Sequence, residues 1–205
     1  MSVLFVKKMI NTKERITKIA LQLFLTKGYA VGINEIIEKS GTSKGAFYHH
    51  FASKGQLFIN TIETFFLSNL NEIDFIEDPN LSFRQKIFKL VNNSYKPFKE
   101  IKELISEKNG LNYLSIIAEY PNHENLRNKN HLHFNQFMDA IGKIIHKAIE
   151  DGSIKRSVNI NTLSYQIGML IDGSIFDAIM MYNSVEKAEQ ACLLAVDQLV
   201  DMLES

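Results

Sequence analysis

Apolar residues recur three and four positions apart along most of the chain, which is the spacing of helices that bury one face. The first such stripe follows Thr12 and consists of Ile16, Ile19, Ala20, Leu23 and Phe24. Charged side chains occupy the positions between them. No stretch of the chain has the strict alternation of apolar and polar residues that is typical of a half-buried strand. The pattern therefore predicts an all-α protein of about nine helices.

Glycine, asparagine and proline interrupt this pattern and divide it into helical segments. Pro97 should break or kink a helix after Tyr95, because proline lacks a backbone N–H and disfavours helical geometry in the residue before it. The expected helical segments are residues 12–27, 34–39, 44–50, 53–78, 82–95, 98–108, 111–119, 123–150, 160–181 and 185–203.

Local motifs mark the ends of the first four helices. Gly28 and Gly41 should end helices, since glycine readily adopts the positive φ of a helix cap. Thr42 or Ser43 should cap the third helix. Ser53 and Gln56 have the spacing of a capping box, in which the serine oxygen accepts a backbone amide and the glutamine returns to the serine amide.

Length and composition exclude several classes of protein. A chain of 205 residues with 45% hydrophobic residues can form one domain or two small ones with a sizeable core. The single cysteine, Cys192, permits no internal disulfide and suits a reducing compartment. No apolar run approaches the roughly 18 residues of a membrane-spanning helix, so we expect a cytoplasmic protein. Residues 1–9 have no signal-peptide pattern and are expected to be a frayed leader.

The net charge of zero hides an asymmetry. Residues 1–60 contain nine basic and three acidic residues, a net charge of +6, whereas the remaining residues carry −6. A basic amino-terminal part on an acidic body suggests a polyanionic partner for the basic part, although a solvated basic helix face would produce the same count.

A glycine between two short helices, at Gly41, is typical of a helix-turn-helix. The second helix would enter the major groove of DNA, so its outward residues should be small, hydrogen-bonding or basic. The residues that meet this demand are Ser43, Lys44, Gly45, Ala46, Tyr48 and His49. Phe47 and Phe51 should point inward. Lys54, with the first amides of the fourth helix, should meet a phosphate.

The segment from Ile36 to Lys54, with its core Ser-Lys-Gly-Ala-Phe-Tyr-His-His-Phe-Ala-Ser-Lys, resembles the DNA-binding domain of the TetR family of transcriptional regulators. The end of the first helix, Leu23 to Tyr29, fits the same pattern. The family often has hydroxyl residues where this chain has Val31-Gly32-Ile33, so we expect a backbone amide near Gly32 to replace that phosphate contact. The resemblance implies a helix-turn-helix domain over residues 10–56 and a ligand-binding and dimerisation domain over 57–205.

The resemblance further implies a homodimeric repressor on a pseudo-palindromic operator, released by a small-molecule inducer. The alternative is a DNA-binding protein of the same fold with an architectural or protein-partner role and no inducer. An enzyme is not expected, because the sequence has no glycine-rich phosphate loop and no nucleophile elbow. Small residues of the last two helices should form the dimer interface, with packing inside the protomer as the alternative; they are Gly168, Gly173, Ser174, Ala178, Ala188, Ala191 and Ala195.

Aromatic and methionine side chains of the middle helices are the candidates for the ligand pocket, although such stripes also form ordinary cores. The candidates are Phe65, Phe66, Phe88, Tyr95, Tyr113, Phe134, Phe137, Met138 and Met169. Asp172 and Asp177 lie in an otherwise apolar helix, and either could be a counter-ion for a cationic ligand or an ordinary helix-face acid. No cofactor is expected, and no metal, because the histidine pairs His49-His50 and His131-His133 lack the spacing of metal ligands. Cys192 is expected to be a packing residue.

Overall fold

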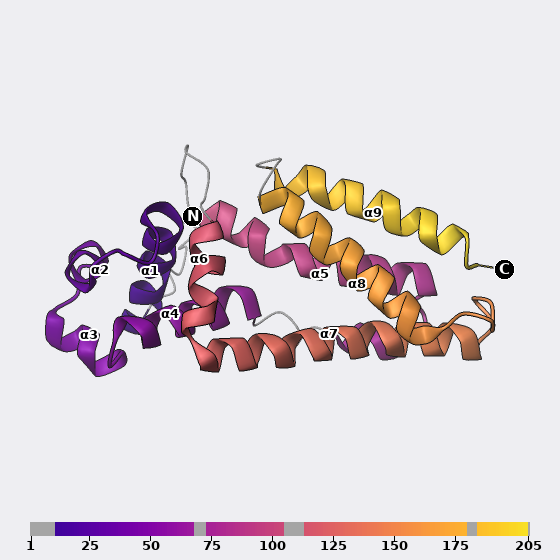
Figure 1. Cartoon of the computed structure of the whole chain (residues 1–205), viewed down its shortest axis with the longest axis horizontal. Helices are drawn as coiled ribbons and strands as arrows, with labels where there is room; N and C mark the ends of the chain where they lie inside the picture. The colour runs from indigo at the N-terminus through magenta and orange to yellow at the C-terminus, as the bar shows by residue number, and fades with distance from the viewer. Residues whose placement is uncertain (1–10, 68–72, 105–112, 180–183, 205) are drawn as a thin grey trace, which may run out of the picture. The chain divides into compact units, whose positions relative to one another are not determined.

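A computed structural model describes residues 11–67, 73–104, 113–179 and 184–204 and confirms the all-α class (Figure 1). The nine α-helices in these ranges are α1 (Thr12–Lys27), α2 (Ile33–Ser40), α3 (Lys44–His50), α4 (Lys54–Ile62), α5 (Phe83–Leu104), α6 (Tyr113–Glu119), α7 (Glu124–Glu150), α8 (Ile160–Asp177) and α9 (Val185–Asp201). A π-helical turn covers Glu63–Leu67, and 3-10 turns cover Asp74–Glu77 and Tyr120–Asn122. Among the described helices, none has the length and apolar character to cross a membrane. The predicted leader, residues 1–9, lies outside the described residues.

The contacts divide the chain into two compact units. The first, here called the head unit, contains the described residues 11–64 and 113–126, and the second, the body unit, contains 65–67, 73–104, 127–179 and 184–204. The head unit therefore includes α6, which lies far from the first four helices in sequence. The predicted division into a DNA-binding domain over residues 10–56 and a ligand-binding and dimerisation domain over 57–205 remains a prediction.

The head unit is built around α1, which packs against α2, α3, α4 and α6. The predicted stripe of α1 is confirmed, because Ile16, Ala20 and Phe24 are fully buried. Asn11 caps this helix by accepting a hydrogen bond from the Glu14 amide at 2.8 Å. Gly28 ends it with φ at 79°, the positive value that the sequence predicts for this glycine.

The body unit packs α5, α8 and α9 side by side, as Figure 1 shows, and α7 contributes to the same core. Buried residues on one face of each helix form this core, and they include Val91, Tyr95, Ile141, Ile167 and Val196. Four helices thus bury one face each, which is the packing that the apolar stripes predict.

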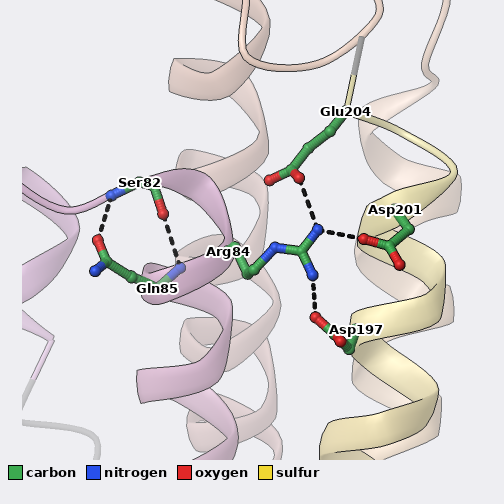
Figure 2. Close-up of polar contacts among 6 residues, drawn as sticks. All are labelled: Ser82, Arg84, Gln85, Asp197, Asp201 and Glu204. Carbon is green, nitrogen blue, oxygen red and sulfur yellow. Dashed lines mark hydrogen bonds and ion pairs between the residues drawn. The ribbon is translucent and has the colours of Figure 1, made fainter.

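A cluster of charges joins the start of α5 to the end of α9 (Figure 2). The Arg84 guanidinium pairs with Asp197, with Asp201 at 2.5 Å and with Glu204 at 2.7 Å. Beside it, Ser82 and Gln85 exchange hydrogen bonds between side chain and backbone at 2.9 and 3.2 Å, which caps α5. The three carboxylates raise the pKa of Arg84, chiefly because Glu204 and Asp201 accept hydrogen bonds from its guanidinium.

Two predicted helix boundaries are wrong. α5 continues through Pro97 to Leu104, because residues on both sides of the proline, Tyr95 and Ile101, are fully buried and hold the helix in place. The fourth helix ends at Ile62 instead of near residue 78 and passes into the π-helical turn. Part of the expected 98–108 and 111–119 helices falls on residues 105–112, outside the described residues.

Candidate nucleic-acid interface

The connection from α2 to α3 has the backbone of a helix-turn-helix. Gly41 follows α2 in the left-handed conformation, with φ at 61° and ψ at 34°, and its amide bonds to the Glu38 carbonyl at 3.0 Å. Ser40 and Thr42 join their hydroxyl groups at 2.9 Å inside this turn. Ser43, and not Thr42, then caps α3 by accepting the Ala46 amide at 3.1 Å. The turn is therefore fixed by residues of its own segment.

Helix α3 has one buried side and one solvent-facing side. Phe47 is completely buried and Phe51 is 2% exposed, which confirms the prediction that both point inward. Tyr48 is 46% exposed, unusual for a large aromatic residue. Ser43, Lys44, Gly45 and His49 are also exposed, and Ala46 is half-buried. The predicted DNA contacts from Ser43 to His49 thus lie together at α3, whereas Lys54 belongs to α4.

Lys54 has partners within the protein. Its ammonium donates to the backbone oxygens of Tyr29 at 2.9 Å and Val31 at 3.3 Å. It also lies 4.3 Å from the centroid of the Tyr29 ring, a cation–π distance. Lys54 therefore joins the first turn of α4 to the loop between α1 and α2. A phosphate contact from this residue remains a prediction, and it would compete with these bonds.

The start of α4 departs from the predicted capping box by one residue. The Gln56 amide donates to the Ser53 hydroxyl at 3.1 Å, as predicted. The Gln56 side chain instead accepts the amide of Ala52 at 2.6 Å, so the reciprocal bond reaches one residue further back. The extended backbone of Ser53, with φ at −155°, accompanies this longer reach.

The start of α2 lacks a side-chain cap. Gly32 occupies the cap position with no side-chain hydrogen bond, and the space around its α-carbon is open. This is the point at which the sequence predicts that a backbone amide replaces a hydroxyl. Acidic and basic side chains pair further along α2, where Glu35 meets Lys27 at 2.5 Å and Lys39 at 3.9 Å.

The histidines do not form a metal site in the part of the chain that the structure describes, where no group of three or more His, Cys, Asp or Glu could hold an ion. His49 and His50 lie edge to face with ring centroids 5.0 Å apart. His131 is exposed, and burial lowers the pKa of His133.

The predicted pocket residues are divided between the two units. Tyr113 belongs to the head unit, and the others belong to the body unit. Tyr95 is fully buried and donates to the Ser174 hydroxyl at 2.7 Å, while Phe137 is 6% exposed. Phe88 and Met138 pack against the same core. Phe65, Phe66, Phe134 and Met169 are half-buried. A ligand-binding role for any of them remains a prediction.

Asp172 and Cys192 differ in their exposure to solvent. The Asp172 residue is exposed on α8, although loss of neighbouring solvent raises the pKa of its carboxyl. Cys192 is 2% exposed in the core of the body unit, and burial raises the pKa of its thiol. A high thiol pKa disfavours the reactive thiolate, which agrees with a packing role for this cysteine.

Some of the small residues of α8 and α9 are buried inside the protomer, and others are exposed on its surface. Gly168, Ala178 and Ala188 are buried inside the protomer, and a β-carbon on Gly168 would lie 2.9 Å from the Met138 sulfur. Gly173 and Ala191 are exposed. For the first three, the alternative prediction of packing inside the protomer is confirmed.

The family match lies in the head unit, and the curated relatives match over part of the chain. Residues 16–61 match the family model described as bacterial regulatory proteins, tetR family. YerO of Bacillus subtilis, an uncharacterized HTH-type transcriptional regulator, is 35% identical over 100 residues, which are 47% of this chain and 35% of YerO. QacR of Staphylococcus aureus, an HTH-type transcriptional regulator, is 39% identical over 54 residues, 26% of this chain and 29% of QacR. The aligned segments thus span only about a third of these relatives.

Solved structures match over nearly the whole chain. A putative transcriptional regulator from Saccharomonospora viridis, in complex with choline, has a TM-score of 0.71 at 17% identity and covers 94% of this chain and 97% of its own. Reduced NemR of Escherichia coli has a TM-score of 0.67 at 17% identity and covers 92% and 96%. At such identities the likeness establishes the fold. The family match and the turn at Gly41 together assign residues 16–61 to the DNA-binding region of the tetR family of bacterial regulatory proteins.

Proposed function

We propose that the protein is a homodimeric transcriptional repressor that binds a pseudo-palindromic DNA operator through α3 and is released by a small molecule in the body unit. The observation that carries the proposal is the two-sided α3. Phe47 and Phe51 anchor it, while Lys44, Tyr48 and His49 face solvent.

The exposed side of α3 suits the major groove of DNA. The groove admits one helix, and small residues such as Gly45 and Ala46 let the backbone approach the base edges. Tyr48 and His49 carry hydrogen-bonding groups on long side chains, and Lys44 supplies a positive charge. The helix contains no acidic residue that would oppose the phosphates.

Exposed apolar side chains on the last two helices support a homodimer. Tyr165 and Phe176 of α8 are 58% and 52% exposed, and Leu194 of α9 is 71% exposed. Large apolar residues gathered on one pair of helices are typical of an interaction surface. Two such helices from each protomer would form a four-helix interface, with two α3 helices in successive major grooves roughly 34–36 Å apart.

The inducer would bind in the body unit among the aromatic and methionine residues. The acidic charge of this part of the chain favours a cationic or neutral apolar molecule over an anion. The S. viridis protein was solved in complex with choline, a cation. Asp172 is the acidic residue we propose as a counter-ion. The observation that supports the alternative without an inducer is the burial of Tyr95 and Phe137 in the core.

Fluorescence anisotropy tests the proposal, with duplex DNA from upstream of the protein's own coding region and a scrambled duplex as the control. We expect one dimer to bind the upstream duplex at least about a thousandfold more tightly than the scrambled one at physiological salt. Equal and steeply salt-dependent binding to both duplexes would favour the architectural alternative. Absence of binding at low salt would contradict the proposal.

Lysine variants in the same assay identify the phosphate contacts. Lys44→Ala should weaken binding to both duplexes and reduce the slope of log K against log salt by about one for each phosphate that the dimer no longer neutralises. Lys129→Ala, an exposed lysine of α7, is the control. Lys54→Ala should reduce the slope in the same way only if the ammonium leaves Tyr29 and Val31 for DNA; an unchanged slope would restrict Lys54 to its internal bonds.

A further inference from the structure

His123 belongs to an aromatic cluster of the head unit. Its ring stacks on Phe58 of α4, with centroids 5.2 Å apart and planes 29° apart. It meets Tyr29 edge to face at 5.6 Å. Phe58 in turn contacts Phe24 of α1 at 5.3 Å and Tyr29 at 5.0 Å. One imidazole thus contacts side chains from both α4 and the loop between α1 and α2.

The absence of a side chain at Gly55 provides the space for this ring. A β-carbon added to Gly55 would lie 3.3 Å from His123 Cε1 and 3.8 Å from Nδ1. The ring cannot easily retreat, since Phe58 and Tyr29 hold its face and edge. Gly55 is the second residue of α4, directly after Lys54. The His123 ring therefore rests on the first turn of α4, which also contains Lys54.

Glu119 provides a polar partner on the other side of the ring. Its carboxylate lies 3.3 Å from His123 Nε2, and both side chains are mostly buried. The Nε2 atom makes no hydrogen bond within the described structure, so the carboxylate is close without the alignment of a bond. Glu119 also contributes to the raised pKa of Tyr29, after desolvation.

The cluster continues to the proposed DNA-binding surface. Tyr29 carries the Lys54 ammonium over its ring and accepts a hydrogen bond from it through its backbone oxygen. The orientation of Tyr29 and of the first turn of α4 therefore depends on both Lys54 and His123. The sequence from Glu119 to His123 connects α6 with the start of α7, and His123 joins this connection to α4.

We propose that His123 is a positioning residue for DNA binding: its imidazole, seated against Gly55 and Phe58, holds α4 and the Tyr29 loop in the geometry that DNA requires. The role rests on the proposed DNA-binding function. His123 touches no DNA, so its removal should lower affinity while leaving the number of phosphate contacts unchanged. The Gly55 space makes the role testable through a pair of substitutions.

The experiment measures the affinity of the full chain for the upstream duplex across a salt series, with the active fraction of each variant determined by stoichiometric titration. The variants are His123→Ala, His123→Phe, Gly55→Ala and the double variant of His123→Ala with Gly55→Ala. His123→Ala should weaken binding about tenfold with an unchanged salt slope, because the preorganised geometry disappears and no charged group is removed from the DNA surface. His123→Phe, which keeps an aromatic ring, should recover most of the affinity.

Gly55→Ala should weaken binding to a similar extent in the wild-type background, because the added methyl group displaces the ring. It should weaken binding no further in the His123→Ala background, where the ring is absent. A Gly55→Ala effect of equal size in both backgrounds would overturn the proposal, since the methyl group would then be acting on DNA or on α4 itself. Wild-type affinity of well-folded His123→Ala would also overturn it. If wild type binds neither duplex, the DNA-binding function fails, and the positioning role fails with it.

Discussion

The head and body units differ in how strongly their amino-acid sequences are constrained. The head unit contains residues 16–61, the segment that matches the family model, and 48 residues of the chain are 50% identical to the TetC protein of transposon Tn10 from Escherichia coli. The body unit shares its fold with structures such as reduced NemR, whose overall identity is 17%. A helix that must fit a groove needs particular residues at particular positions, whereas a helix bundle needs only apolar stripes of suitable volume.

The charges of α3 differ from those of the body unit and from those of α2, where Glu35 pairs with Lys27 and Lys39. In the body unit, cations pair with acids on neighbouring helices, as Arg84 does with three carboxylates and Lys102 does with Glu186 at 2.7 Å. In the head unit, α3 contains basic and polar residues and no acid. Charges in the body unit therefore stabilise packing, and those on α3 are available to a partner.

The largest effect should come from the buried side of α3. Phe47→Ala removes a ring with no exposed surface, so it should lower the free energy of unfolding by about 3–5 kcal/mol and abolish DNA binding by unfolding the head unit. Urea denaturation followed by circular dichroism measures the change. An intact head unit in this variant would contradict the assignment of Phe47 as the anchor of α3.

The exposed side of the same helix should behave in the opposite way. Tyr48→Ala should weaken binding to the upstream duplex about tenfold, because one good base or backbone contact contributes about 1–3 kcal/mol. Its unfolding midpoint should stay close to wild type, since Tyr48 is 46% exposed. Leu132→Ala, 58% exposed on α7, is the control for an exposed apolar side chain. Unchanged affinity in folded Tyr48→Ala would exclude Tyr48 from the interface.

The contribution of the Arg84 ion pairs to the stability of the body unit should depend on salt concentration. Arg84→Met leaves Asp197, Asp201 and Glu204 near one another without their cation, so it should lower the melting temperature by a few degrees at low salt. The destabilisation should shrink near 1 M salt, where the Debye length is about 3 Å. DNA affinity measured on the folded variant should keep its wild-type salt slope. A destabilisation that is independent of salt would indicate that Arg84 acts through packing of its aliphatic stem.

The parts of the structure that follow from neighbouring residues could be predicted. The turn at Gly41, the cap at Ser43 and the inward rings of Phe47 and Phe51 depend on contacts within a few positions, so their spacing is visible in the sequence. The end of α4 could not be predicted, because the apolar period continues beyond Ile62 while the backbone changes to a π-helical turn.

Contacts between distant segments were not visible in any pattern. Lys54 resembles a phosphate ligand by its place at a helix start, and the structure shows its ammonium on Tyr29 and Val31. The packing of His123 against Gly55 joins residues 68 positions apart, and neither has a periodicity that points to the other. A glycine at position 55 is also compatible with an ordinary helix start. Its role in leaving space for the His123 ring is therefore visible only in the three-dimensional structure.

The smallest effect on the melting temperature should come from Asp172, an exposed acid of the body unit that is not among the paired acids around Arg84. Desolvation raises the pKa of Asp172 in the folded protein above the ordinary value, so ionisation of this carboxyl opposes folding. That cost is absent below the unfolded pKa and fully present above the folded pKa. Asp172→Asn should therefore raise the melting temperature by about a degree at pH 7 and leave it unchanged near pH 3. Differential scanning calorimetry at both pH values measures the shift, and Asp177→Asn, an exposed acid of the same helix, is the control. If Asp172→Asn destabilises the protein at pH 7, the Asp172 carboxylate has a favourable partner within the protein. That result would contradict its proposed role as a counter-ion for a cationic ligand, because the role requires an unpaired carboxylate.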